Sequence, residues 1–193
     1  MKKSVHLLAI LVVLLMTGCV RVATLSPERD ESWAKPCQIA GVKNCFMLEP
    51  GLYRSAQPTA QGIANLNEMG ITNILSLRHG SKDNRLARDT LLRCHHVIMS
   101  AFSIDEEALL EALAIMVAER NRPLLVHCFH GADRTGVACA AYRVVVQDWS
   151  KEKAIEEMRC GQFGFHGFLM NAVASIRKLD VEKARRRLGI QPK

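Results

Sequence analysis

PLLVHCFHGADRTG, residues Pro123–Gly136, is the stretch that decides the fold. The apolar run Leu124–Val126 follows a proline and predicts a short buried strand. After Gly136 the chain continues with VACAAYRVVV, whose length and alanine content predict a buried helix. The loop between them leaves several backbone N–H groups without partners, beside the positive end of the helix dipole. The segment therefore predicts a socket for a tetrahedral dianion.

The loop carries the residue types that a cysteine nucleophile needs. Cys128 would face the unpaired N–H groups and the helix N-terminus, which favour the nucleophilic thiolate. Arg134 offers a planar guanidinium that can bind two phosphate oxygens. Gly131 suits a position of positive φ, Thr135 can donate a hydrogen bond to the thiolate, and His127 can orient the loop from behind. The residues expected to bind the anion are Phe129, His130, Gly131, Ala132, Asp133 and Arg134.

The motif HCFHGADRTG resembles the HCxxGxxR[ST] signature of the cysteine-dependent protein tyrosine and dual-specificity phosphatases. The resemblance is greatest to compact bacterial members and their atypical plant and fungal relatives, because Leu52–Pro58 (LYRSAQP) resembles their YRSxQP opening. It extends over residues 51–179. It implies a phosphocysteine intermediate on Cys128, phosphate binding by Arg134 and the loop amides, and neither a metal nor another cofactor.

Alternative functions fit parts of the pattern. A membrane-tethered phosphate-binding module would be expected to have lost Cys128 or Arg134, and both are present. Rhodanese-like sulfur transfer also uses a looped cysteine, but the preceding histidine and the Arg-Thr pair argue against it. Hydrolysis of inositol polyphosphates or other small phosphomonoesters stays open beside action on phosphorylated proteins, because basic residues near the mouth would bind extra phosphates. These are Arg78, His79, Lys82, Arg85 and Arg88.

Two aspartates are candidates for the general acid that protonates the leaving group. Asp105 precedes a long helix, where tyrosine phosphatases of this kind usually keep their acid. Asp133 directly precedes Arg134, a placement that resembles the myotubularin-type lipid phosphatases. Each also has a structural explanation, because Asp105 suits the helix dipole and Asp133 can form an ion pair that fixes the loop. The sequence leaves both assignments open.

The first 19 residues predict an export signal. Lys2 and Lys3 precede the apolar run Leu7–Met16, which is too short to cross about 30 Å of hydrocarbon comfortably. The ending LMTGC resembles a bacterial lipobox, which implies lipidation of Cys19. An ordinary signal peptide is the alternative. We therefore expect an exported lipoprotein, anchored to a membrane on its periplasmic or extracytoplasmic side.

The whole chain of 193 residues, with 49% hydrophobic residues, is enough for one globular domain. We expect a signal peptide at 1–19, a tether and irregular cover segment at 20–50, and a phosphatase domain at 51–193. The net charge of +7 suits an anionic substrate, whereas 5% aromatic residues and no basic run with interleaved aromatics exclude a nucleic-acid platform. The oligomeric state stays open.

Strands and helices alternate after residue 51, which predicts an α/β fold. The expected sheet is largely parallel, with four to five strands and helices on both faces. Ligands bind at the carboxyl ends of such strands, so Arg78, His79 and the loop Met99–Ser103 should lie near Cys128. The expected strands are Leu52–Arg54, Ile71–Leu77, His95–Met99 and Leu124–Val126. The expected helices are Thr59–Met69, Asn84–Leu92, one from a Ser103–Glu106 capping box to Arg120, and three after Ser150.

The cysteines suggest two disulfides for an exported chain. Cys37 and Cys45 lie eight residues apart, which fits a local bond, although two free thiols are the alternative. Cys94 falls on a strand expected to neighbour that of Cys128, and whether a protective bond joins these two is left open by the sequence.

Overall fold

The computed structural model describes residues 29–168 and 170–191. The chain divides into two units, Met1–Asp30 and Glu31–Lys193, and the fold described below is that of the second. The expected signal sequence and the lipidation site Cys19 lie outside the described residues. Within the described residues, no helix has the length and apolar character needed to cross a membrane.

The second unit is built on a six-stranded sheet of order β1-β2-β3-β6-β4-β5. Strands β3, β6, β4 and β5 are parallel, and β1 and β2 add an antiparallel edge. The strands are β1 Lys35–Pro36, β2 Phe46–Glu49, β3 Leu52–Ser55, β4 Asn73–Ser76, β5 Arg93–His96 and β6 Leu124–His127. Strand β6 lies between β3 and β4 and is buried along its whole length, which explains its unbroken apolar run. The predicted α/β class and parallel sheet are confirmed.

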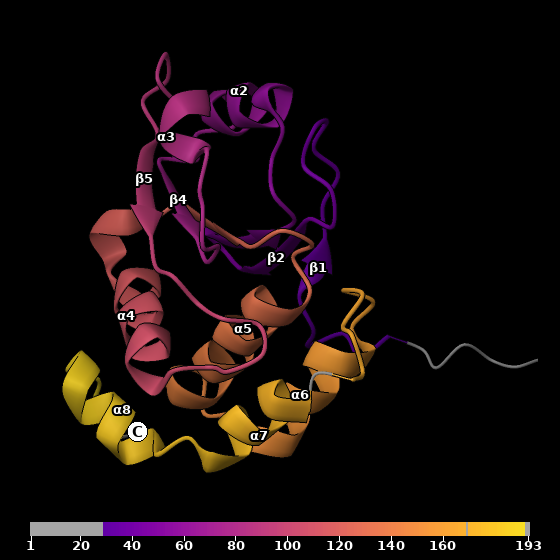
Figure 1. Cartoon of the computed structure of the whole chain (residues 1–193), viewed down its shortest axis with the longest axis vertical. Helices are drawn as coiled ribbons and strands as arrows, with labels where there is room; N and C mark the ends of the chain where they lie inside the picture. Colours follow the sequence, from indigo (N-terminus) through magenta and orange to yellow (C-terminus); the bar gives the residue numbers. More distant parts are fainter. Residues whose placement is uncertain (1–28, 169, 192–193) are drawn as a thin grey trace, which may run out of the picture. The chain divides into compact units, whose positions relative to one another are not determined.

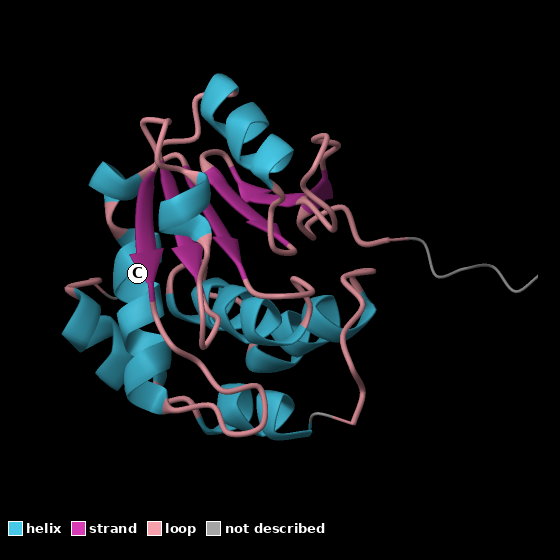
Figure 2. Cartoon of the chain, turned by 45° about the horizontal axis from the view of Figure 1, so that its top comes forward, coloured by secondary structure: helices cyan, strands magenta, loops and turns pink. Residues whose placement is uncertain are grey.

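Helices cover both faces of this sheet, as Figures 1 and 2 show. They are α2 Ala60–Glu68, α3 Asp83–Leu86, α4 Glu106–Val117, α5 Asp133–Val145, α6 Lys151–Cys160, α7 Met170–Lys178 and α8 Val181–Leu188, with a 3-10 turn at Glu119–Asn121. Thr59 and Ser150 cap α2 and α6 as expected. The prediction of a capping box that begins at Ser103 is wrong. Asp105 is the N-cap of α4, and its carboxylate accepts a hydrogen bond from the Ala108 amide. The helix expected over Asn84–Leu92 is only the short α3.

Side chains of β6 alternate between two cores. Leu124 and Val126 belong to the larger core, together with residues of α4, α5 and α7. Leu125 points to the opposite face, where it packs with Ile63 and Leu66 of α2. Burial on both faces fixes the register of β6, because a slip by one residue would exchange the two sets of side chains. The loop that follows β6 therefore starts from a firmly held strand.

The helix after that loop, α5, runs through the interior. Every residue from Thr135 to Val145 is buried, including the charged Arg143. The Arg143 guanidinium forms a buried ion pair with Glu157 of α6, with Nη2 and Oε1 2.7 Å apart. Glu157 Oε1 also accepts from the Ala34 amide at 2.6 Å, so α5, α6 and the segment before β1 are joined. These contacts satisfy the charge that Arg143 brings into the core.

The expectation of an irregular cover segment is wrong for residues 35–49, which contribute β1 and β2 to the same sheet. Two strands of two and four residues give too short an alternation to be recognised in the sequence. Continuing the register Pro36↔Phe46 places Cys37 opposite Cys45, and the Cys37 amide donates to the Cys45 carbonyl at 2.9 Å. Both are free thiols with their Sγ atoms 3.5 Å apart, so the expected disulfide is not formed in this structure.

The expected link between Cys94 and Cys128 is also wrong. Cys94 lies on β5, and β4 separates that strand from β6. The sheet order places the two cysteines two strands apart, which is too far for a direct disulfide bond. The buried Cys139 of α5 is another thiol near the centre, and burial raises its pKa to about 11. Such a thiol is inert at neutral pH.

Candidate active site

The loop His127–Arg134 joins the end of β6 to the start of α5 at Asp133. Gly131 has a φ of +74°, and a Cβ there would lie 2.5 Å from the backbone of Ser55 and Ala56. No other residue fits that position, as the sequence predicted. The Gly131 amide donates to Cys128 Sγ at 3.3 Å, and the thiol is almost fully buried at 2% exposure. The loop therefore encloses its cysteine.

Three groups outside the loop hold its carbonyls. The Gln57 amide donates to Phe129 O at 3.1 Å, Asn44 Nδ2 to His130 O at 2.8 Å, and Arg54 Nη2 to Gly131 O at 2.8 Å. In a planar trans peptide the carbonyl and the following N–H point in opposite directions. The amides of His130, Gly131 and Ala132 are therefore turned away from these supports, and the middle one already donates to the sulfur.

The first turn of α5 leaves further amides free for an anion. Ala132 is the N-cap residue and provides no side-chain hydrogen bond. The guanidinium of Arg134 reaches the carbonyl of Leu77 at 3.4 Å and is half-buried. The hydroxyl of Thr135 is buried and has no hydrogen-bond partner within the described residues. A hydroxyl without a partner is consistent with the predicted hydrogen bond from Thr135 to the sulfur of Cys128. That hydrogen bond stays a prediction.

A buried ion pair supports the loop from behind. His127 Nε2 lies 2.9 Å from Asp83 Oδ2, and its Nδ1 lies 3.0 Å from the Cys128 carbonyl. Asp83 also accepts from Ser81 Oγ at 2.6 Å and from Gln57 Nε2 at 2.7 Å. Burial alone would raise the pKa of Asp83, but its contacts with His127, Ser81 and Gln57 outweigh burial and hold the pKa well below its usual range. His127 thus has the orienting position that the sequence predicted.

Arg54 and Asp83 are site residues that sequence reasoning missed. Arg54 is only 1% exposed, and its guanidinium carbon lies 3.7 Å from the centre of the Phe163 ring. The resemblance of Leu52–Pro58 to the family opening contained this arginine without indicating its role. Asp83 is separated from His127 by 44 residues and stands in a polar stretch, so no local pattern marks it.

The two candidate acids occupy different surroundings. Both carboxylate oxygens of Asp133 are engaged by His166, with Oδ1 accepting from its amide at 3.0 Å and Oδ2 lying 2.8 Å from its Nδ1. Asp105 is exposed and uses only Oδ2, which accepts from the Ala108 amide at 3.1 Å. Its second oxygen has no hydrogen bond within the described residues. Each aspartate therefore has a structural role of the kind considered from the sequence, Asp105 at the start of α4 and Asp133 in contact with His166. Only Asp105 keeps one carboxylate oxygen without a hydrogen bond within the described residues.

A buried strand, a cysteine enclosed by inward-facing amides, an arginine and a buried helix define a cysteine-dependent phosphatase. Comparison with protein families supports the assignment to this class. The family model described as "Tyrosine phosphatase family" matches residues 41–179, and the chain belongs to that family.

Individual relatives are phosphatases of two kinds. The dual specificity protein phosphatase TpbA of Pseudomonas aeruginosa is 34% identical over 180 residues, which cover 93% of this chain and 81% of TpbA. Inositol diphosphatase DSP3 of Arabidopsis thaliana is 27% identical over 129 residues, 62% of each protein. Among solved structures, TpbA in complex with pTyr is 33% identical with a TM-score of 0.74, covering 83% of this chain and 98% of that one.

The site and these relatives together establish the reaction class. The chain is a phosphatase that hydrolyses phosphate monoesters through a phosphocysteine intermediate. In this reaction a cysteine thiolate attacks phosphorus, the leaving oxygen takes a proton, and water then hydrolyses the thiophosphate ester, and Cys128 is the predicted nucleophile. The loop amides and Arg134 are the groups predicted to bind the phosphoryl oxygens, on which charge develops in both steps.

The contact between His127 and Asp83 behind the loop should make the free energy of unfolding depend on pH. Because the pKa of Asp83 is lowered in the folded state, its carboxylate stabilises the fold above the unfolded pKa of about 3.9, and this contribution is lost as the pH falls below it. Asp83→Asn should lower the free energy of unfolding by about 2–3 kcal/mol at pH 7. In urea unfolding followed by circular dichroism, this difference should shrink toward pH 3. Asp89→Asn, on an exposed residue, is the matched control, and a pH-independent difference for Asp83→Asn would contradict the assignment.

The general acid can be assigned by paired substitutions. We expect Asp105→Asn to lower kcat by about 100-fold and to remove the basic limb of the kcat–pH profile. The loss should be larger for phenyl phosphate than for p-nitrophenyl phosphate, whose leaving group needs less protonation. Asp133→Asn should keep the basic limb, because His166 already engages both of its carboxylate oxygens. The opposite pattern would assign the acid to Asp133.

Proposed function

We propose that the chain dephosphorylates phosphotyrosine in proteins and acts outside the cytoplasm as a lipid-anchored enzyme. A cavity of about 610 Å³ lies beside the phosphate loop, next to its supports Asn44 and Gln57, and its lining includes neither Cys128 nor Arg134. Phe129 and His130 of that loop form one side, and Ile39, Val42 and Pro58 contribute apolar walls. Such an apolar surface can hold side chains beside the phosphorylated residue, and the choice of phosphotyrosine itself rests on the likeness to TpbA. The pTyr complex of the relative TpbA supports the same choice.

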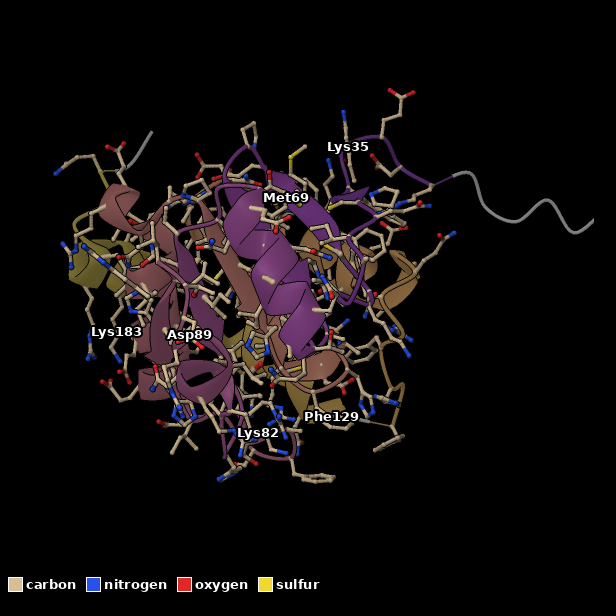
Figure 3. All side chains as sticks on the ribbon, turned by 90° about the horizontal axis from the view of Figure 1, so that it is seen from above. Lys35, Met69, Lys82, Asp89, Phe129 and Lys183 are labelled. Carbon is tan, nitrogen blue, oxygen red and sulfur yellow. The ribbon has the colours of Figure 1, made fainter. Side chains whose placement is uncertain are left out.

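The rim of the cavity is shaped by Phe129, whose side chain is exposed. The Arg78 guanidinium lies 5.1 Å from the centre of this ring and donates to Gln57 Oε1 at 2.8 Å. Gln57 in turn donates to Asp83, so the rim is connected to the buried ion pair. Figure 3 shows Phe129 and Lys82 along the same edge of the molecule. This edge gives a substrate both an aromatic surface and positive charge.

Hydrolysis of inositol diphosphates is the second candidate. Lys82, Arg85 and Arg88 are exposed in and beside α3, and none of them forms an ion pair within the part of the chain that the structure describes. Free cations at this position would bind additional phosphates of a small polyphosphorylated substrate. The relatives named inositol diphosphatases in plants support this candidate.

The test uses the chain without residues 1–19. It should turn over p-nitrophenyl phosphate in EDTA, and Cys128→Ser and Arg134→Ala should each lose about 10³-fold or more in kcat/KM with an unchanged circular dichroism spectrum. Cys160→Ser, on an exposed thiol, is the matched control. Among phosphopeptides, inositol phosphates and nucleotides, phosphotyrosine peptides should give the highest kcat/KM. A higher value for inositol diphosphates would favour the second candidate, and a metal requirement would contradict the mechanism.

The anchor has its own test. The proposal rests on the signal pattern of residues 1–19, with Cys19 in the position that lipidation requires. Cells producing the full chain with an alkyne-bearing fatty acid should label the protein and retain it in the membrane fraction. Cys19→Ala should abolish both label and retention, whereas Cys160→Ser should change neither. Labelling that persists in Cys19→Ala would refute anchoring at this residue.

A further inference from the structure

Three potential metal ligands meet at the edge of the phosphate loop. One ligand atom each from His130, Asp133 and His166 lies within 4.8 Å of the other two. His130 and Asp133 belong to the loop itself, and His166 comes from the turn before α7. The first two flank Gly131 and Ala132, and the Gly131 amide donates to Cys128 Sγ inside the loop. Two imidazole nitrogens and one carboxylate oxygen form a ligand set typical of zinc.

The backbone around this cluster is already held in place. Asn44 Nδ2 donates both to His130 O at 2.8 Å and to Phe163 O at 2.9 Å, which joins the phosphate loop to the turn carrying His166. The His166 amide donates to Asp133 Oδ1 at 3.0 Å, which orients that carboxylate. The Asp133 side chain is only 12% exposed. Ligands with fixed backbones lose little freedom when an ion binds.

The side chains need only small movements to close around an ion. His166 Nδ1 and Asp133 Oδ2 are 2.8 Å apart, whereas two ligands at about 2.0–2.1 Å from a tetrahedral zinc ion lie about 3.3 Å apart. The ring of His130 is exposed and makes no hydrogen bond within the described residues, so it can rotate. Its centre lies 5.5 Å from that of His166.

We propose that His130, Asp133 and His166 bind a divalent transition-metal ion of the zinc type, and that this ion inhibits the phosphatase. Three protein ligands leave a fourth position for water or a phosphate oxygen. An ion there adds positive charge next to Arg134 and holds released phosphate in the loop. The ion is a regulator in this proposal, because the hydrolysis steps use only Cys128, the amides, Arg134 and an acid.

Zinc binding tests the ligand set directly. The chain without residues 1–19 is titrated with zinc against a chromophoric chelator, and one ion per chain is expected. His166→Ala and His130→Ala should each weaken binding at least tenfold, since loss of even an outer-shell partner typically costs 10–100-fold. His79→Ala, on an exposed histidine outside the cluster, is the matched control. Equal affinity in both cluster variants, or no binding by the wild type, would overturn the proposal.

The thiols are the competing ligands and are excluded by two variants. Binding should persist in Cys128→Ser and in Cys37→Ser, and cobalt in place of zinc should give no thiolate-to-cobalt charge-transfer band. Loss of binding in Cys128→Ser would place the ion on the nucleophile and overturn the proposed site. Turnover of p-nitrophenyl phosphate should fall along the wild-type binding curve and recover in EDTA. Full turnover at saturating zinc would overturn the inhibitory role.

Discussion

The site depends on the direction of three carbonyl groups. Those of Phe129, His130 and Gly131 accept hydrogen bonds from Gln57, Asn44 and Arg54, so the amides that follow them point away from these supports, and that of Gly131 donates to Cys128 Sγ. An isolated eight-residue loop would not keep this arrangement. Its N–H dipoles point toward one another and repel, and each N–H group is more stable when it is hydrated. The supports come from β3, from the residues directly after it and from the loop before β2, which together oppose that tendency.

The surrounding fold provides those supports at fixed positions. Strand β6 is buried between two parallel neighbours, and α5 is buried along almost its whole length, so both ends of the loop are immobile. Gly131 approaches the backbone of Ser55 and Ala56 so closely that a Cβ would lie 2.5 Å away. Behind the loop, the pair of His127 and Asp83 binds the carbonyl of the nucleophile's own residue. Placement of the sulfur is therefore a property of the whole sheet rather than of the motif alone.

Much of this was predictable from the sequence, and the reason differs from element to element. The strand–loop–helix of residues 123–145 combines an apolar run, a cysteine, a glycine and an arginine at short range, so local chemistry identified it. Strands β1 and β2 were missed because they are short and depend on pairing, β2 with β3 and β1 with β2. The contacts of Asn44 with His130 and of Asp83 with His127 span 86 and 44 residues, and no local pattern reports them. The sequence predicts the nucleophile, whereas only the structure shows how its loop is supported.

The central claim is that Cys128 accepts the phosphoryl group while the loop amides and Arg134 hold its oxygens. Mixing the enzyme with excess phosphotyrosine peptide, quenching in acid within the first turnover and locating the phosphate by peptide mass spectrometry tests it most directly. We predict one phosphate on the peptide that contains Cys128, and none in Cys128→Ser. Turnover without any phosphorylated enzyme, or with the phosphate on another residue such as His130, would contradict the account.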